Sequence, residues 1–178
     1  DNATVLLLGS GRSDKSNINQ AVAKGLKARV ALTQGKWAVA AQMASEARVG
    51  FTLMSQSSYR AGFSVGSQAN SEFMWASQIQ PDQTDTFGNF GAFMSRNFSS
   101  SSIRSNPRSI SSLLYNKISE SDVRKSLWDP TGKHLSIGLP SNFQKFPYTS
   151  QKFIAAAIGD SRVDVPLMRS AEMYLIEA

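Results

Sequence analysis

The chain has 178 residues and a formal net charge of +6, and it is 41% hydrophobic and 18% charged. It contains no cysteine, which excludes a disulfide framework and a cysteine-based metal site. No apolar run is long enough to span a bilayer. The positive charge is consistent with an anionic partner such as nucleic acid, an anionic glycan or lipopolysaccharide. Because Lys and Arg are scattered along the chain, we favour a solvated surface and expect no nucleic-acid partner.

Residues 17–50 carry the pattern of two helices joined by a tight turn. Either Ser16 or Asn17 is the expected N-cap of the first helix, because its side-chain oxygen can accept a hydrogen bond from a free amide. Gly35 and Gly50 are expected to end the two helices, since glycine enters the left-handed conformation without strain. The apolar residues of the first helix recur near the 3.6-residue period of a packed helix; they are Ile18, Val22, Leu26 and Leu32.

Trp37 opens the second expected helix, and small alanines follow it on one face. Small residues let two helix axes approach closely, and we expect Trp37 and Trp75 to be core residues. This pattern is typical of a tetratricopeptide-type hairpin. One such hairpin cannot bury its own apolar face and therefore needs neighbours.

Residues 51–163 are predicted to be rich in loops, with only short regular elements. Residues 72–80 alternate apolar and polar side chains, which predicts a short strand. Short helices are expected over 108–117 and 121–127. The long connection over 83–108 is rich in Gly, Ser and Asn, and we expect no stable helix around Phe87, Phe90 and Phe93 because glycines interrupt them.

Residues 164–178 are predicted to start a later helix. Asp164 is the expected N-cap, and Pro166 fits the first turn, where its missing N–H costs nothing. Arg169 and Glu172 would then form an i,i+3 pair on this helix.

Four blocks of the sequence, in order, resemble the SusD/RagB family of outer-membrane nutrient-binding lipoproteins. The run LKARVALTQGKWAVAAQMASEA at 26–47 resembles the family's helical hairpin, and Asn70–Trp75 resembles its "N-S-E" strand. Ser121–Arg124 contains a "D-x-R" element, and Asp164–Ala178 resembles the helix "D-x-P-x-x-R-x-A-E-x-Y-L". The resemblance spans nearly the whole chain.

The resemblance implies a mainly α fold of tetratricopeptide-like hairpins with long irregular loops, a SusD-like α/α superhelix. Residues 1–178 would be part of a single SusD-like domain, with the hairpin at 17–50, the loop-rich region at 51–163 and a later helix from 164. Because family members are several times longer and the last helix pattern has no stop signal, we expect this chain to be a fragment.

The resemblance also implies a function. The protein would be a lipoprotein of the cell outer membrane, exposed at the cell surface, that captures a glycan or other nutrient. It would pass this ligand to a SusC-like TonB-dependent transporter, and its N-terminal lipid anchor would lie outside this sequence. Binding and delivery would require no cofactor and no covalent chemistry.

Catalytic and metal-binding patterns have little support in the sequence. His134 is the only histidine, and we interpret it as a surface loop residue because nothing around it resembles a nucleophile elbow. The carboxylates show no spacing typical of a glycosidase pair or an EF-hand loop. We therefore expect a binding protein and not an enzyme.

Sugar binding requires aromatic rings against the apolar faces of the sugar and polar groups at its hydroxyl rim. The 83–108 connection offers both kinds of residue, and long loops of this kind tend to be functional. The candidate ligand-binding residues are Phe87, Asn89, Phe90, Phe93, Arg96 and Phe98, together with Trp128.

Three alternatives stay open at this point. The aromatic rings of the loop could be core residues that hold the loop in place. The chain could be a helical-repeat adaptor that binds only protein, which a buried aromatic cluster would favour. It could also belong to an enzyme whose catalytic residues lie elsewhere, which a pair of convergent carboxylates with shifted pKa values would favour.

Overall fold

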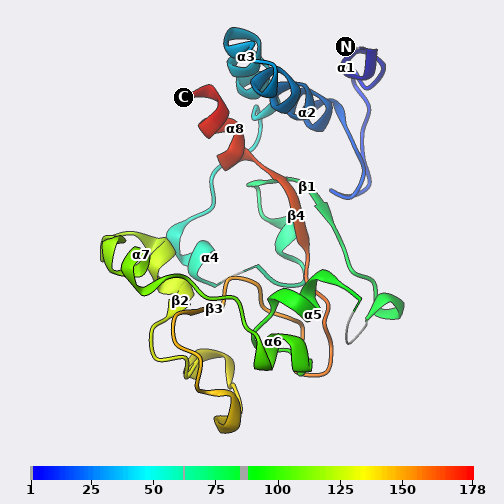
Figure 1. Ribbon diagram of the computed structural model, residues 1–178. Coiled ribbons are helices and arrows are strands. Elements are labelled where there is room, and N and C mark those ends of the chain that lie inside the picture. Colours follow the sequence, from blue (N-terminus) through cyan, green and yellow to red (C-terminus); the bar gives the residue numbers. More distant parts are fainter. Residues whose placement is uncertain (1, 62, 85–87) are drawn as a thin grey trace. The chain divides into compact units, whose positions relative to one another are not determined.

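The computed structural model describes residues 2–61, 63–84 and 88–178 (Figure 1). Contacts divide the chain into two compact units. The first unit consists of Asp1–Met54, Ser67–Ser77 and Val165–Ala178, and the second of Ser55–Gly66 and Gln78–Asp164. Segments far apart in the sequence therefore fold together in the first unit. That all 178 residues belong to one domain stays a prediction.

The first unit is built around two antiparallel helices, which Figure 1 shows side by side. Its elements are α1 (Asn2–Leu6), α2 (Gln20–Thr33), α3 (Trp37–Ala47), the 3₁₀ turn η1 (Ser67–Ala69), β1 (Phe73–Ser77), β4 (Val165–Arg169) and α8 (Ser170–Glu177). Helix α8 packs against both α2 and α3. The predicted helical hairpin is confirmed.

Small residues bring α2 and α3 together, as their sequence indicated. Gly25 leaves the space that the side chains of Met168 and Met173 occupy. Packing of this kind buries apolar area with little free volume. The buried core cluster of the unit consists of Val22, Ala28, Ala44, Ala47, Met74, Met168 and Met173.

The ends of the hairpin helices correct two expectations. The N-cap of α2 is Asn19, whose Oδ1 accepts from the Val22 amide at 3.1 Å, and not Ser16 or Asn17. The backbone of Gly35 is left-handed (φ 69°), as expected for a helix stop. Trp37 is 67% exposed and is not a core residue, because the alanines of α3 occupy the face that packs on α2.

The last segment also differs from its prediction. Residues Val165–Arg169 form strand β4, and the helix begins only at Ser170, so Asp164 does not cap it. Strand β4 pairs antiparallel with β1, with Pro166 opposite Ala76 (Figure 1). A two-stranded sheet leaves one edge of each strand free, and a free edge tolerates proline. Pairing with β1, which lies within the strand predicted over 72–80, therefore overrides the helix pattern.

This strand changes the ion pairs of the unit. Arg169 does not pair with Glu172 but donates to the Glu72 carboxylate at 2.7 Å. Glu172 instead receives two hydrogen bonds from Arg29, both at 2.6 Å. Arg29 also donates to the Leu167 carbonyl. The two arginines thereby connect β4 and α8 to the rest of the unit.

The second unit consists of short elements connected by irregular chain. They are α4 (Gln56–Arg60), η2 (Pro81–Gln83), α5 (Phe90–Met94), α6 (Ser101–Ser105), α7 (Ser112–Lys117), η3 (Val123–Leu127), β2 (Trp128–Asp129), η4 (Leu135–Ile137), η5 (Ser141–Phe143) and β3 (Thr149–Ser150). The 83–108 connection thus contains two short helices, against expectation. The helix expected at 121–127 is the 3₁₀ helix η3, which Asp122 caps.

Helix α5 forms despite its glycine because two contacts hold it. Asn89 caps it by accepting from the Ala92 amide at 3.0 Å. A Cβ atom on Gly91 would lie 1.8 Å from the Ser161 carbonyl oxygen. Only glycine permits this close approach, so Gly91 is part of the packing rather than a helix breaker.

Over the described ranges, no helix is both long enough and apolar enough to cross a membrane.

Candidate ligand-binding surface

The side chain of Asn89, a predicted ligand contact, is fully used inside the protein. Its Oδ1 caps α5, while its Nδ2 donates to the Gln83 carbonyl at 3.1 Å and to the Ser161 hydroxyl at 2.7 Å. These bonds connect α5 to the 159–163 segment. In this structure Asn89 therefore positions the loop, and contact of its amide with a ligand stays a prediction.

Two phenylalanines of the predicted set lie at or near the surface. Phe93 is 40% exposed. Phe90 is half-buried and packs edge-to-face on Phe153, with ring centroids 4.8 Å apart. Phe153 in turn contacts the buried Phe63. Phe93 is therefore the ring of this loop with the most free area for a ligand among those described, and Phe87 lies outside the described residues.

Two other predicted residues lie in the interior of the unit. Phe98 is buried in a small cluster with Ala92 and Ala155. Arg96 is 0% exposed, and its guanidinium donates to the backbone carbonyls of Ile103 and Phe143 at 2.9 and 2.7 Å. Both side chains hold the loop in its conformation here. The structure therefore does not bring the predicted residues together as one exposed group.

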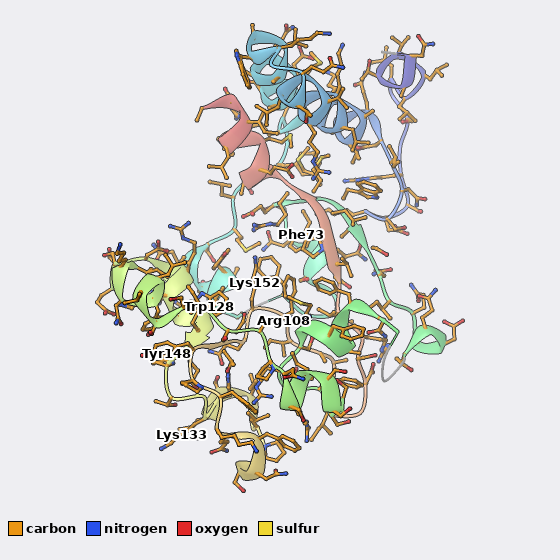
Figure 2. All side chains as sticks on the ribbon, in the orientation of Figure 1. Phe73, Arg108, Trp128, Lys133, Tyr148 and Lys152 are labelled. Atoms are coloured by element: carbon orange, nitrogen blue, oxygen red, sulfur yellow. The ribbon has the colours of Figure 1, made fainter. Side chains whose placement is uncertain are left out.

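Trp128 lies on a different part of the unit, in strand β2. This strand pairs antiparallel with β3, with Trp128 opposite Ser150. The Tyr148 amide donates to the Asp129 carbonyl at 2.7 Å, so Tyr148 lies on the neighbouring segment (Figure 2). The ring of Tyr148 packs against Tyr115 of α7, with centroids 5.2 Å apart.

We call Tyr115, Trp128 and Tyr148 the aromatic surface; each of the three is half-buried. Tyr and Trp combine an apolar ring with a polar group, which suits the C–H faces and hydroxyls of a sugar. The sequence pattern pointed to Trp128 but not to the two tyrosines, because the Gly/Ser-rich connection from which the other candidates came contains neither of them. The sequence does show both tyrosines: Tyr115 lies in the helix expected over 108–117, and Tyr148 directly follows Pro147.

The backbone beneath this surface is strained. Tyr148 has φ 59° and His134 has φ 48°, values in the left-handed region that non-glycine residues seldom adopt. Strain of this kind persists only where the surrounding structure imposes it, and it concentrates at functional sites. Here Asp129 imposes it, since its carboxylate accepts from the His134 amide at 2.6 Å.

His134 is not the surface residue that its polar surroundings suggested. It is 0% exposed, and its ring contacts the hydroxyl of Thr149 and the amide of Gln151. Burial lowers the pKa of His134 below its usual value, partly opposed by Gln151 and Asp129. For Asp129, burial acts to raise the pKa, but the hydrogen bonds from Thr131 and His134 outweigh it and lower the pKa. This pair stabilises the 129–134 turn.

The described part of the chain contains no group of three or more His, Cys, Asp or Glu residues that could hold a metal ion. Its carboxylates are engaged in ion pairs or turns rather than placed as a facing pair; an example is Asp122, which receives hydrogen bonds from Arg124.

A groove of about 590 Å³ lies in the first unit, along α1, α2 and the start of α3. Its lining is mostly apolar and includes Leu26, Val30 and Val39. Lys27 and Lys36 are among its polar lining residues. Trp37, Val30 and Val39 expose apolar area nearby on the hairpin. This hairpin face is a second candidate binding surface, of a kind suited to protein.

The fold defines a mainly α protein class with a tetratricopeptide-like hairpin. No family model and no curated protein sequence matches the chain. A solved SusD-like carbohydrate binding protein from Bacteroides vulgatus is similar, with a TM-score of 0.73 and 24% identity over 94% of this chain and 34% of that one. A SusD superfamily protein from Bacteroides thetaiotaomicron has a TM-score of 0.65 and 21% identity over 98% and 39%.

A SusD-like protein from Bacteroides fragilis is also similar, with a TM-score of 0.64 and 14% identity over 98% of this chain and 45% of that one. The chain therefore has the SusD-like fold, and the prediction of a partial, mainly α, SusD-like domain is confirmed. It spans between about a third and less than half of the length of these solved structures.

Proposed function

We propose that this chain is part of a cell-surface protein of the outer membrane that captures a glycan or other nutrient. The observation that supports this most is the SusD-like fold over nearly the whole chain, shared with a solved carbohydrate binding protein. The ligand passes to a SusC-like TonB-dependent transporter, and a lipid anchor outside this sequence holds the protein at the membrane. The mechanism is binding and delivery, without covalent chemistry.

The proposed ligand site is the aromatic surface, with Phe93 as a further contact. The half-buried tyrosine and tryptophan side chains offer some flat apolar area without first having to leave a core. Stacking against a sugar adds dispersion and burial, at about 25 cal/mol for each Å² of apolar area removed from water. Aromatic side chains also lose little conformational entropy on binding, because they have few rotatable bonds.

The proposal is tested by affinity-gel retardation of the protein across a panel of polysaccharides, with Trp128→Ala and Phe93→Ala variants. Trp37→Ala is the control, because it removes the same type of side chain at an exposed position on the hairpin. We expect one or more polysaccharides to retard the protein and the Trp128→Ala variant to lose at least about tenfold in affinity, near 1.4 kcal/mol. Retardation that Trp128→Ala and Phe93→Ala leave unchanged would contradict the proposed site.

A protein-binding adaptor is the second candidate function, and the exposed apolar face of the hairpin favours it. Trp37, Val30 and Val39 are exposed beside the groove in the first unit, and exposed apolar patches commonly mark protein interfaces. In a nutrient-capture protein the same face would contact the transporter. Absence of glycan binding, together with loss of a protein partner in Trp37→Ala, would favour the adaptor.

A further inference from the structure

Two arginines of the second unit are buried without an acidic partner. Arg96 is 0% and Arg104 is 7% exposed. Within the described residues, neither guanidinium forms an ion pair, and their hydrogen bonds go to backbone carbonyls. These carbonyls belong to Phe98, Ile103, Arg104 and Phe143.

The hydrogen bonds leave part of each guanidinium unsatisfied. Arg96 Nε and Arg104 Nη2 are buried and have no hydrogen-bond partner within the described residues. Burial, and then the nearby charge of Arg104, lowers the pKa of Arg96 to about 10, so Arg96 remains cationic at neutral pH. Burial also lowers the pKa of Arg104, but an arginine side chain keeps its charge in proteins. Salt screens buried charges less than exposed ones, so the two arginines contribute positive potential even in the presence of salt.

The segment 143–146 contacts the two arginines and adds one more positive charge, Lys145. The ring of Phe143 lies 4.8 Å from the Arg104 guanidinium carbon, and the ring of Phe146 lies 5.6 Å from that of Arg96. The Nζ atom of Lys145 also lies 5.6 Å from the Phe146 ring centroid. The two half-buried rings therefore pack against the buried guanidinium groups, and Lys145 contacts the same Phe146 ring as Arg96.

Lys133 lies in a turn that packs on Phe146. The turn before Lys133 packs closely on the backbone of Phe146: a Cβ atom on Gly132 would lie only 2.3 Å from the Phe146 carbonyl oxygen. Lys133 and Lys145 are both exposed, and neither forms an ion pair among the residues that the structure describes. We call Lys133 and Lys145, with Arg96 and Arg104 beneath them, the basic patch.

The carboxylates of the surrounding chain are already occupied. Glu120 pairs with Lys125 at 2.5 Å, and Asp122 pairs with Arg124 at 2.5 Å. Asp129 accepts from the backbone and side chain of its own turn. Glu120 and Asp122 are therefore neutralised by their own cations, and the single negative charge of Asp129 does not balance the four cations of the basic patch. An anion from outside the chain would complete this balance.

We infer that the basic patch binds the acidic groups, carboxylate or sulfate, of an acidic glycan. The inference rests on the proposed glycan-binding function and names the class of its ligand. The turn that holds Lys133 begins at Asp129, directly after Trp128 of the aromatic surface, and Figure 2 shows Trp128, Tyr148 and Lys133 in this part of the unit. A single acidic polysaccharide could therefore contact the aromatic surface with its sugar rings and the basic patch with its acidic groups.

The test compares acidic polysaccharides with neutralised forms of the same backbone. Polygalacturonate and its methyl ester isolate the carboxylate, and chondroitin sulfate and desulfated chondroitin isolate the sulfate. We expect the protein to bind at least one acidic form about tenfold more tightly than its neutralised partner, with the preference shrinking as salt rises.

The variant Lys133→Gln/Lys145→Gln removes the two surface charges without disturbing the core. It should weaken binding of the acidic form about three- to tenfold, the range of partly exposed charge contacts, and leave the neutralised form unchanged. The control Lys36→Gln/Lys117→Gln removes the same charge at exposed residues that are not part of the basic patch and should bind as the unmodified protein does.

The outcomes separate this inference from the proposed function. If neutral and acidic forms bind equally, or if Lys133→Gln/Lys145→Gln has no effect on the acidic form, the inference is overturned while glycan binding stands. If no polysaccharide binds, acidic or neutral, both the inference and the proposed function are overturned. Circular dichroism of each variant confirms that the fold survives.

Discussion

Arg169 Nη1 donates a 2.7 Å hydrogen bond to the carboxylate of Glu72, which is 3% exposed and 97 residues earlier in the chain. The second Glu72 oxygen accepts from the Met54 amide at 2.7 Å. A single carboxylate thus joins strand β4, the start of β1 and the chain after the hairpin. These three segments have no local reason to meet, so Glu72 is a central tertiary contact of the first unit.

Replacing Arg169 with alanine should therefore destabilise the protein by about 1–3 kcal/mol, because it leaves the buried carboxylate of Glu72 without its cation. Arg169→Lys should retain part of this stability. Arg124→Ala, which removes an exposed pair with Asp122, is the control and should leave the unfolding midpoint unchanged. Urea unfolding measures all three, and equal midpoints for Arg169→Ala and Arg124→Ala would refute the role of Arg169.

The Gly91→Ala variant should lose about 1–3 kcal/mol of stability, the usual cost of inserting a methyl group into a packed contact. Its Cβ would meet the backbone oxygen of Ser161, which cannot move as a flexible side chain can. Gly11→Ala is the matched control, since nothing lies within 4 Å of its Cβ position. Thermal unfolding distinguishes them, and a Gly91→Ala variant as stable as Gly11→Ala would show that α5 does not pack here.

Protonation of His134 should make stability pH-dependent below neutrality. Burial lowers its pKa in the folded state below the ordinary value of 6.5, so the unfolded state binds the proton more readily. Stability should therefore be fully present above about pH 6.5 and fall as the pH decreases below it, by at most about 1.4 kcal/mol per pH unit.

Urea unfolding between pH 7.5 and 5.5 measures this slope, in a range above the titration of ordinary carboxylates. The His134→Gln variant should show a smaller slope, whatever its absolute stability. An identical slope in the variant would mean that His134 titrates as it does in the unfolded chain.

Local patterns predicted the parts of the fold that local interactions determine. The helical hairpin, its stop at Gly35 and the strand at 73–77 follow from periodicity and glycine placement. Strand β4 did not, because Pro166 and the apolar positions after it fit a helix start as well as an edge strand. Only its pairing with β1, a strand from the middle of the chain, decides between them.

The candidate site was predicted less completely, for a physical reason. A phenylalanine in a Gly/Ser-rich loop can face solvent or fill the space beneath the loop, and its sequence neighbours do not distinguish the two. Phe93 faces solvent while Phe98 is buried, only five residues later. Arg96 and His134 likewise looked like surface residues, and tertiary packing alone buries them.

The central claim is that a glycan binds at Trp128, and ligand-induced change in tryptophan fluorescence tests it most directly. The chain has 3 tryptophans, so Trp128→Phe and Trp37→Phe assign the signal while each retains an aromatic ring. We predict that soluble fragments of the best-binding polysaccharide change the fluorescence of the unmodified protein and of Trp37→Phe, and that Trp128→Phe loses the change. A saturable change that persists in Trp128→Phe would place the ligand elsewhere and contradict the account.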